Sequence, residues 1–250
     1  MKRLLALAVW LFIFTSCRSP VSLQKSESVF YTPQISTTTP VDSSSIIFAQ
    51  PYKAKLDSTM NEVIGQSQIA MEKGQPESVL GNFVADLCYE SAVNLFKNYS
   101  KQPVDFCVLN NGGLRSSLPA GSITRRNVYE LMPFDNELVV VTLSPDSVKS
   151  LLNYIAEKGG VPVANLQMRI KDKKPGDVMI GGKPYDPTKS YNVATSDYLS
   201  NGGDNMIMFS GAMQTESLGI KIRDAIINYI SDSGKKQMVL KPATDGRISN

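Results

Sequence analysis

The stretch Asn110-Asn111-Gly112-Gly113-Leu114-Arg115 follows the apolar run Val104 to Leu109, which predicts a buried strand. Two amides, two glycines and an arginine make a poor core, so we expect this corner to lie at a ligand-accessible surface. The glycines allow close backbone approach, and the arginine offers a planar set of donors to an anion or a sugar. From this spacing alone, a ligand-binding arginine and a plain surface arginine at a turn are equally consistent with the sequence.

A second polar corner, Ser200-Asn201-Gly202-Gly203-Asp204, follows another strand-like run, Tyr191 to Thr195. Two such corners after two strands predict one shared site. An ionised Asp204 is suited to accept hydrogen bonds from two ribose hydroxyls, although an ordinary turn aspartate would look the same. The Gly-Gly-Asp pattern matches neither the Walker motif nor the dinucleotide-binding fingerprint.

Two aromatic residues lie beside these corners. Phe134, between Pro133 and Asp135-Asn136, is either an exposed ring that stacks on a base or a core ring at the end of a helix. Tyr198 precedes the second corner and either stacks likewise or packs beneath the loop.

The rest of the domain alternates irregularly between predicted helices and strands. It therefore predicts an α+β fold with a mixed β-sheet flanked by helices. We expect helices from Glu77 to about Tyr99, from Arg125 to Met132 with Thr124 as N-cap, from Ser144-Pro145-Asp146 to Gly159, and from Leu218 to Ile230 with Gly234 closing it. We expect further strands at Glu137–Leu143, Asn165–Lys171 and Gln237–Leu240, with turns at Lys174–Asp177 and Gly181-Gly182.

The N-terminal residues predict export and lipidation. Residues 1–16 have a basic start and an apolar run, as in a secretory signal peptide. Phe14-Thr15-Ser16-Cys17 resembles a bacterial lipobox, which would make Cys17 the lipidated residue; the alternative is an ordinary cleaved signal. Residues 17–45, rich in Ser, Thr and Pro, predict a flexible tether, and 46–250 predict one domain. Arg18 after Cys17 favours a lipoprotein of the bacterial outer membrane, facing the periplasm, over one of the inner membrane.

Composition excludes several classes of function. The chain has no histidine, which argues against a serine triad and against the usual imidazole metal sites. An all-carboxylate magnesium site stays open, but Asp86, Asp135, Asp197 and Asp204 lack the local spacing of a metal loop. The net charge of +3 comes without a basic stripe, so nucleic acid is not an expected partner. Cys88 and Cys107 are expected to be two buried thiols rather than a disulfide.

The order of the motifs is more specific than any one of them. The segments are Glu77 to Asp86, Asn110 to Arg115, Gly121 to Thr124, Met132 to Asn136 and Asp197 to Asp204. Together they resemble the C-terminal domain of the 5'-nucleotidase / UDP-sugar hydrolase family, over about Ile64 to the C-terminus. That resemblance implies that Phe134 and Tyr198 hold a nucleobase between them. It also implies that Arg115 and Asn110 face the ribose and phosphate, Asn136 the base edge and Asp204 the ribose hydroxyls.

In that family a separate metallophosphatase domain, rich in His, Asp and Asn, binds two metals and performs the hydrolysis. Since this chain has no histidine, we expect no catalytic residue, no metal and no cofactor in it, with the divalent metals held by a partner. The expected function is the nucleoside- or nucleotide-binding half of a split 5'-nucleotidase that serves nucleotide catabolism and is inactive alone. The alternative is a free-standing lipoprotein that binds nucleosides or nucleotide sugars.

This chain also departs from the family pattern. The family's substrate arginine ahead of Leu80-Gly81-Asn82 is replaced by Gln75-Pro76-Glu77, and Tyr198 replaces the usual phenylalanine. Asp135 and Asn205 each stand where the family usually has a glycine. A carboxylate at Asp135 is expected to disfavour an anionic substrate, so recognition of the nucleoside is predicted more strongly than recognition of phosphate.

Overall fold

The computed structural model describes residues 43–250, and the chain divides into two units, 1–47 and 48–250. The predicted signal peptide, Cys17 and the predicted tether as far as residue 42 lie outside the described residues. The remaining tether residues, 43–45, begin helix α2 (Ser43–Met60), which the sequence analysis did not predict. Its apolar side chains, Phe48, Tyr52 and Leu56 among them, stay exposed, so no buried face gave a helical period. Within residues 43–250 no helix is both long and apolar enough to span a bilayer.

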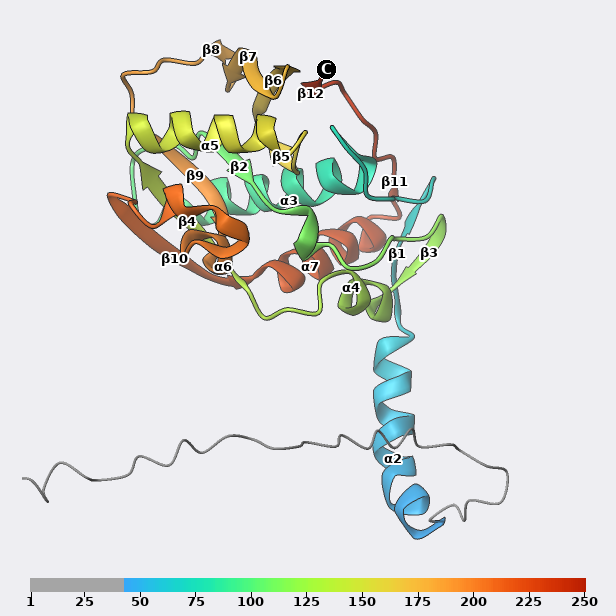
Figure 1. Cartoon of the computed structure of the whole chain (residues 1–250). Helices are drawn as coiled ribbons and strands as arrows, with labels where there is room; N and C mark the ends of the chain where they lie inside the picture. The colour runs from blue at the N-terminus through green and yellow to red at the C-terminus, as the bar shows by residue number, and fades with distance from the viewer. Residues whose placement is uncertain (1–42) are drawn as a thin grey trace, which may run out of the picture. The chain divides into compact units, whose positions relative to one another are not determined.

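A mixed five-stranded sheet lies at the centre of the second unit (Figure 1). Its strand order is β10-β4-β9-β2-β5, with β2 and β9 parallel and the other neighbours antiparallel. The strands are β2 (Phe106–Val108), β4 (Glu137–Leu143), β5 (Val163–Ala164), β9 (Tyr191–Ser196) and β10 (Gln214–Lys221). The predicted α+β class is confirmed.

Both faces of this sheet are buried, which explains why its strands read as continuous apolar runs. Alternate residues of β4 enter two separate cores: Leu138 and Val140 on one face, Val139 and Val141 on the other. Helices α3 (Val79–Phe96) and α7 (Ile222–Lys235) pack in the first core, and α5 (Pro145–Glu157) packs in the second.

Two predicted helix starts are confirmed by their caps, and a third helix, α3, begins at Val79, two residues later than predicted. Ser78 caps α3, Ser144 caps α5 with Pro145 in the first turn, and Thr124 caps α4 (Arg125–Leu131). At α4, Asn127 also accepts a hydrogen bond from the backbone N–H of Thr124, which completes a capping box. These side chains satisfy amide groups that have no partner inside the helix, so the boundaries were readable from sequence.

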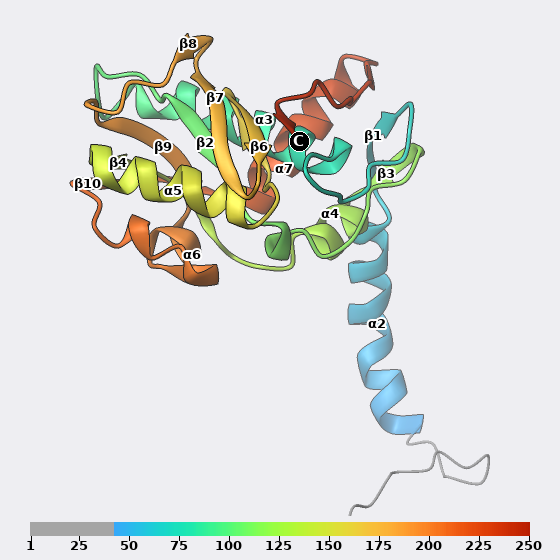
Figure 2. The same ribbon diagram turned by 45° about the horizontal axis from the view of Figure 1, so that its top comes forward.

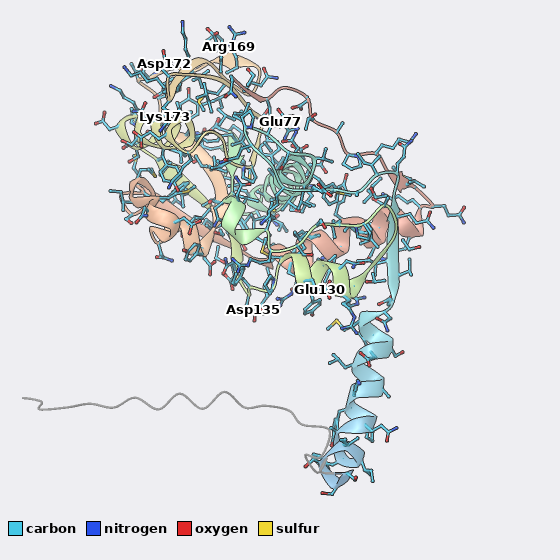
Figure 3. All side chains as sticks on the ribbon, turned by 45° about the vertical axis from the view of Figure 1, so that its right-hand side comes forward. Glu77, Glu130, Asp135, Arg169, Asp172 and Lys173 are labelled. Carbon is cyan, nitrogen blue, oxygen red and sulfur yellow. The ribbon has the colours of Figure 1, made fainter. Side chains whose placement is uncertain are left out.

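A second sheet, β12-β6-β7-β8, packs on α5 (Figure 2). Its strands are β6 (Leu166–Lys171), β7 (Lys174–Ile180), β8 (Lys183–Pro184) and β12 (Ile248–Ser249). The predicted turn at Lys174–Asp177 is wrong: these residues belong to β7, and the turn is made by Asp172 and Lys173 (Figure 3). Both turn residues have positive φ, 50° and 58°, the conformation that a two-residue hairpin requires. The turn at Gly181-Gly182 is confirmed.

The third sheet, β11-β1-β3, consists of β1 (Val63–Ser67), β3 (Gly121–Thr124) and β11 (Val239–Leu240), and α7 packs on β1. The predicted helix over Leu218–Ile230 is wrong at its start. Leu218 to Lys221 extend β10, whose pairing shifts register near Gly219 (φ 68°), and α7 begins at Ile222. Gly234 does not follow the end of α7 but is its next-to-last residue. A glycine is required there because a Cβ would come within 2.4 Å of the Ile64 carbonyl oxygen.

Cys88 and Cys107 are free, buried thiols, as predicted. Burial raises the pKa of Cys88 to about 12 and that of Cys107 well above its ordinary value, so both stay protonated and unreactive.

Candidate functional site

The central sheet brings three loops to one edge. β2 and β9 are parallel neighbours, so their carboxyl ends, and the two glycine corners that follow them, lie side by side. β4 runs antiparallel to β9, with Leu138 opposite Ser196, so the loop that leads into β4 reaches the same edge. Ligands of open α/β sheets bind beyond the carboxyl ends of parallel strands, and this is the corresponding position here.

At this edge a cavity of about 280 Å³ holds every substrate-binding residue that the sequence predicted. Its wall is formed by Asn110, Gly112, Gly113, Arg115, Phe134, Asn136, Tyr198 and Asp204. These residues come from three loops that span nearly a hundred positions of the chain. The structure thus brings all six candidates together, and their roles toward a ligand remain predictions.

The first corner is a short 3-10 turn, η1 (Asn111–Gly113), that leaves Arg115 exposed. Within residues 43–250 no carboxylate lies within ion-pair distance of Arg115. The only hydrogen bond of its side chain there is a long one, 3.5 Å, from Nη1 to the carbonyl oxygen of Gly112. The guanidinium carbon lies 6.0 Å from the centre of the Phe134 ring. The donors of Arg115 are therefore available to an anionic group.

Phe134 is exposed, at 39%, so the alternative of a core ring is excluded. A nearly buried arginine, Arg223 of α7, holds its loop from below. Arg223 Nη1 donates to the carbonyl oxygens of Met132 (3.4 Å) and Phe134 (3.1 Å), and its guanidinium lies 4.4 Å from the centre of the Tyr129 ring. Arg223 thus fixes the backbone that carries the exposed ring. Sequence reasoning missed it because it lies about ninety residues downstream, within the run read as one helix.

Asp135 does not act as the free negative charge that the sequence analysis expected. Its carboxylate accepts a hydrogen bond from Arg223 Nη2, and Lys221 Nζ lies 3.1 Å from Oδ2. The pKa of Asp135 is lowered, mainly by the hydrogen bond from Arg223 and next by the hydrogen bond and the charge of Lys221. Two cations beside one carboxylate offset its charge, so the expected repulsion of an anionic ligand by Asp135 is not found.

The second corner places Asp204 in an unusual backbone conformation. Asp204 and the following Asn205 both have positive φ, 52° and 62°, at a cost of about 1 kcal/mol each. Asn110 Nδ2 donates to Oδ2 of Asp204, while the Tyr198 hydroxyl donates to Oδ1 at 2.9 Å. Gly203 is required here because a Cβ would come within 2.5 Å of the Tyr198 ring. The carboxylate is therefore held rigidly at the cavity wall.

Tyr198 is 45% exposed, so it does not pack beneath the loop. Its ring lines the same cavity as Phe134. A further tyrosine, Tyr154 of α5, was not predicted: its hydroxyl donates to the backbone carbonyl oxygen of Asp204 at 2.7 Å. Nothing in the local sequence marked Tyr154, because it occupies an ordinary position of an amphipathic helix.

A second cavity, of about 270 Å³, shares Asn110, Gly112 and Asp204 with the first, and Tyr154 and Lys158 line its other side. Gln75, at the position of the missing family arginine, also lines it. The Gln75 side-chain amide donates to the carbonyl oxygens of Lys158 (2.8 Å) and Gly160 (3.0 Å) at the end of α5. Gln75 thus holds the end of α5 in place.

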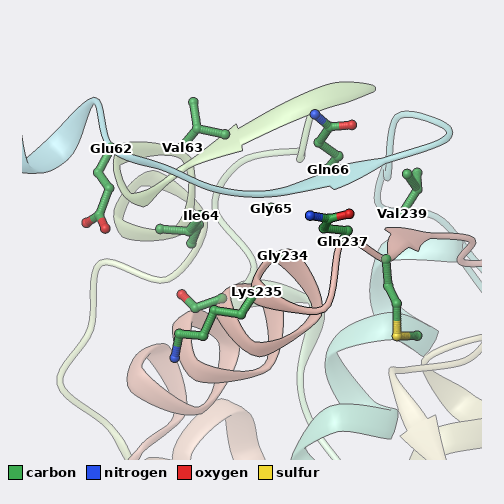
Figure 4. Close-up of a pocket in the computed structure, with 11 residues that line it drawn as sticks. Glu62, Val63, Ile64, Gly65, Gln66, Gly234, Lys235, Gln237 and Val239 are labelled. Carbon is green, nitrogen blue, oxygen red and sulfur yellow. The ribbon is translucent and has the colours of Figure 1, made fainter.

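A larger cavity, of about 390 Å³, lies elsewhere, between β1 and the last turn of α7 (Figure 4). Glu62 and Lys235 are its only charged lining residues, and it contains none of the predicted site residues. Size therefore does not identify the site in this chain; the convergence of aromatic and polar groups does. Within residues 43–250 no group of three or more Asp, Glu and Cys side chains is placed to hold a metal ion.

Comparison with known proteins gives the same assignment. Residues 59–211 match the family described as 5'-nucleotidase, C-terminal domain. The chain is 31% identical over 186 residues to the protein UshA of Escherichia coli, and 29% identical over 202 residues to a 5'-nucleotidase of Vibrio parahaemolyticus. These alignments cover 72% and 74% of this chain but 32% and 34% of the relatives, so the chain spans about a third of their length.

A solved structure shares the fold. The 5'-nucleotidase precursor from Thermus thermophilus superimposes with a TM-score of 0.67 at 23% identity, over 82% of this chain and 42% of that one. At this level of identity the likeness concerns the fold alone.

Proposed function

The chain belongs to the 5'-nucleotidase C-terminal domain family, and from this premise we propose that it is the nucleoside- or nucleotide-binding half of a split 5'-nucleotidase-type hydrolase. The observation that carries the proposal is the single cavity in which two exposed rings, an unpaired arginine and a rigid carboxylate converge. Every nucleobase has a π-face, and stacking on an aromatic side chain contributes about 1–3 kcal/mol per base.

Each group in the cavity has a chemical use toward a nucleotide. Phe134 and Tyr198 hold the base, and Asn136 offers donor and acceptor atoms to its edge. Asp204 accepts from ribose hydroxyls, and Arg115 donates to the phosphate. We assign these groups the role of orienting the substrate, which raises its effective concentration at a catalytic centre.

Catalysis is assigned to a separate dimetal metallophosphatase. The chain has no histidine, so the imidazole ligands usual in such centres have to come from another domain or polypeptide. There the metals would supply an activated water and stabilise the developing charge, while this chain keeps the nucleotide in place. Metal removal is accordingly expected to abolish hydrolysis by the pair and to leave nucleoside binding by this chain unchanged.

The proposal is tested by titration calorimetry of the full chain with adenosine and AMP. We expect binding, and a loss of about 1–3 kcal/mol in the Phe134→Ala variant, because one stacking face is removed. Tyr99→Ala, which removes an exposed ring that does not line the cavity, is the matched control. Absence of heat with both ligands, with and without a metallophosphatase from the same host, overturns the proposal.

A second arm of the experiment addresses the partner. Phosphate release from AMP is expected only when the full chain and a lone metallophosphatase are mixed, and the two should co-purify from the native host. Binding by a chain that co-purifies with no metallophosphatase and changes no phosphate release would instead support a free-standing module that captures nucleosides or nucleotide sugars.

We also propose that the chain is anchored by a lipid on Cys17 at the bacterial envelope, on the evidence of the lipobox-like residues before it. Labelled palmitate should enter the full chain and not its Cys17→Ser variant. A wild-type chain that stays unlabelled in a lipoprotein-competent host contradicts the anchor.

A further inference from the structure

Asp204 is held by more protein contacts than a turn aspartate needs. Tyr198 is bonded to it twice: its hydroxyl donates to Oδ1 at 2.9 Å and accepts from the Asp204 backbone N–H at 3.2 Å. Tyr154 donates to the Asp204 carbonyl oxygen at 2.7 Å, and Asn110 donates to Oδ2. Side chains from three separate segments thus fix both the backbone and the carboxylate of a single residue.

The two tyrosine hydroxyls act on opposite sides of this residue. Tyr198 comes from the short helix α6 (Asp197–Ser200) and lines the cavity that also contains Phe134 and Arg115, called the ring cavity below. Tyr154 comes from α5 and lines the neighbouring cavity. Burial, with the nearby charge of Asp204 as a second cause, raises the pKa of Tyr154, so its hydroxyl stays protonated and remains a donor. Together they oppose relaxation of the left-handed backbone at Asp204 and Asn205.

We infer that Tyr154 and Tyr198 are positioning residues for ribose recognition. The Tyr198 hydroxyl holds the Asp204 carboxylate, and the Tyr154 hydroxyl holds the Asp204 backbone, in the orientation that reads the ribose 2'- and 3'-hydroxyls. This inference rests on the proposed function of the cavity and adds two residues to it. Tyr198 has two separable parts: its ring face stacks on the base, and its hydroxyl acts through Asp204. Tyr154 does not line the ring cavity and acts through Asp204 alone.

This arrangement couples base binding to sugar recognition. A ring that shifts to accept a base moves the hydroxyl that orients Asp204, because the two groups belong to one side chain. A phenylalanine at position 198 would keep the stacking face and lose the coupling. The tyrosine that this chain has in place of the family phenylalanine therefore orders the Asp204 carboxylate before the ligand arrives.

The test compares two ligands that differ only in the hydroxyls concerned. Calorimetry measures adenosine and 2',3'-dideoxyadenosine binding to the full-length wild type, Tyr198→Phe, Tyr154→Phe and Asp204→Asn. We expect each tyrosine variant to lose about three- to tenfold in affinity for adenosine, the scale of one hydrogen bond, and less than about twofold for dideoxyadenosine. Asp204→Asn should remove most of the preference for adenosine.

Tyr229→Phe is the matched control, since it removes a tyrosine hydroxyl from α7 outside both cavities and should change neither affinity. Equal losses for both ligands in the tyrosine variants overturn the inference, because the hydroxyls would then support the ring or the fold in general. Unchanged adenosine affinity in both variants overturns it too. If the wild type binds neither ligand, the proposed function fails, and the inference fails with it.

Discussion

Arg115 and Arg247 are two arginines of one domain that the structure uses in opposite ways. Arg247 is nearly buried: its guanidinium pairs with Asp86 (2.6 Å) and Asp245 (2.8 Å), and Nη1 also donates to the carbonyl oxygen of Val163. Arg115 is exposed, and its side chain makes one long hydrogen bond, to its own corner. An arginine whose donors are all occupied holds a fold together, and one whose donors are free at a cavity wall serves a ligand.

The environment of Arg247 extends this comparison to the neighbouring motif. Glu77, at the start of the segment that resembles the nucleotidase family, accepts hydrogen bonds from the backbone N–H groups of Asp245 (2.7 Å), Gly246 (3.2 Å) and Ile248 (3.3 Å). Glu77 does not line the ring cavity. A motif that helps to identify the family thus includes residues that fasten the C-terminal segment rather than bind substrate.

The largest expected effect is on stability, in the Arg247→Ala variant. It removes the shared partner of two carboxylates and should lower the free energy of unfolding by about 3 kcal/mol, the lower end for breaking a buried ion pair, because Asp86 and Asp245 are half-exposed. Urea unfolding measures it. Arg169→Ala is the control: its contact with Asp177, at 3.8 Å, is exposed and should contribute less than about 0.5 kcal/mol. A loss of unfolding free energy in Arg247→Ala as small as that in Arg169→Ala would show that the Arg247 pairs do not stabilise the fold.

A smaller effect, confined to binding, is expected in Arg115→Ala. Stability should change by less than about 0.5 kcal/mol, because the side chain has almost no protein partner. Affinity for AMP should fall about tenfold while affinity for adenosine stays the same, since only the phosphate is expected to meet the guanidinium. Calorimetry with both ligands measures the difference. A variant that loses both ligands equally would place Arg115 at the base or the ribose instead.

The difference between these arginines also marks what was predictable from the sequence. The shared site was predictable because both glycine corners follow apolar runs, and β2 and β9 prove to be adjacent parallel strands. The supports of the site, Arg223 and Tyr154, were not predictable, because each acts across 50 or more positions of the chain (Tyr154 reaches Asp204, Arg223 reaches Phe134). Single-sequence patterns report local periodicity and caps, and they carry no information on which distant backbone carbonyl a side chain will meet.

The same limit explains the wrong elements. Leu218 to Lys221 have the spacing of a helix, but pairing of β10 with β4 decides their conformation. Proline and glycine at positions 175 and 176 indicated a turn, whereas the tight turn is made by Asp172 and Lys173, just before them in the chain. Tertiary pairing overrides local propensity in both cases.

The smallest expected effect is a pH dependence in the Arg247 network. The hydrogen bond from Arg247 lowers the pKa of Asp245 below its ordinary value of 3.8. A group whose pKa is lower in the folded than in the unfolded state stabilises the fold above the unfolded value, and this contribution is lost as pH falls through the folded value. The difference in unfolding free energy between the wild type and Asp245→Asn should thus be constant from about pH 7 to about pH 5 and shrink below about pH 4. Arg115 has no such partner, so Arg115→Ala should show the pH profile of the wild type throughout. If the difference in unfolding free energy between the wild type and Asp245→Asn stays constant down to about pH 2, the charge of Asp245 does not stabilise the fold through Arg247.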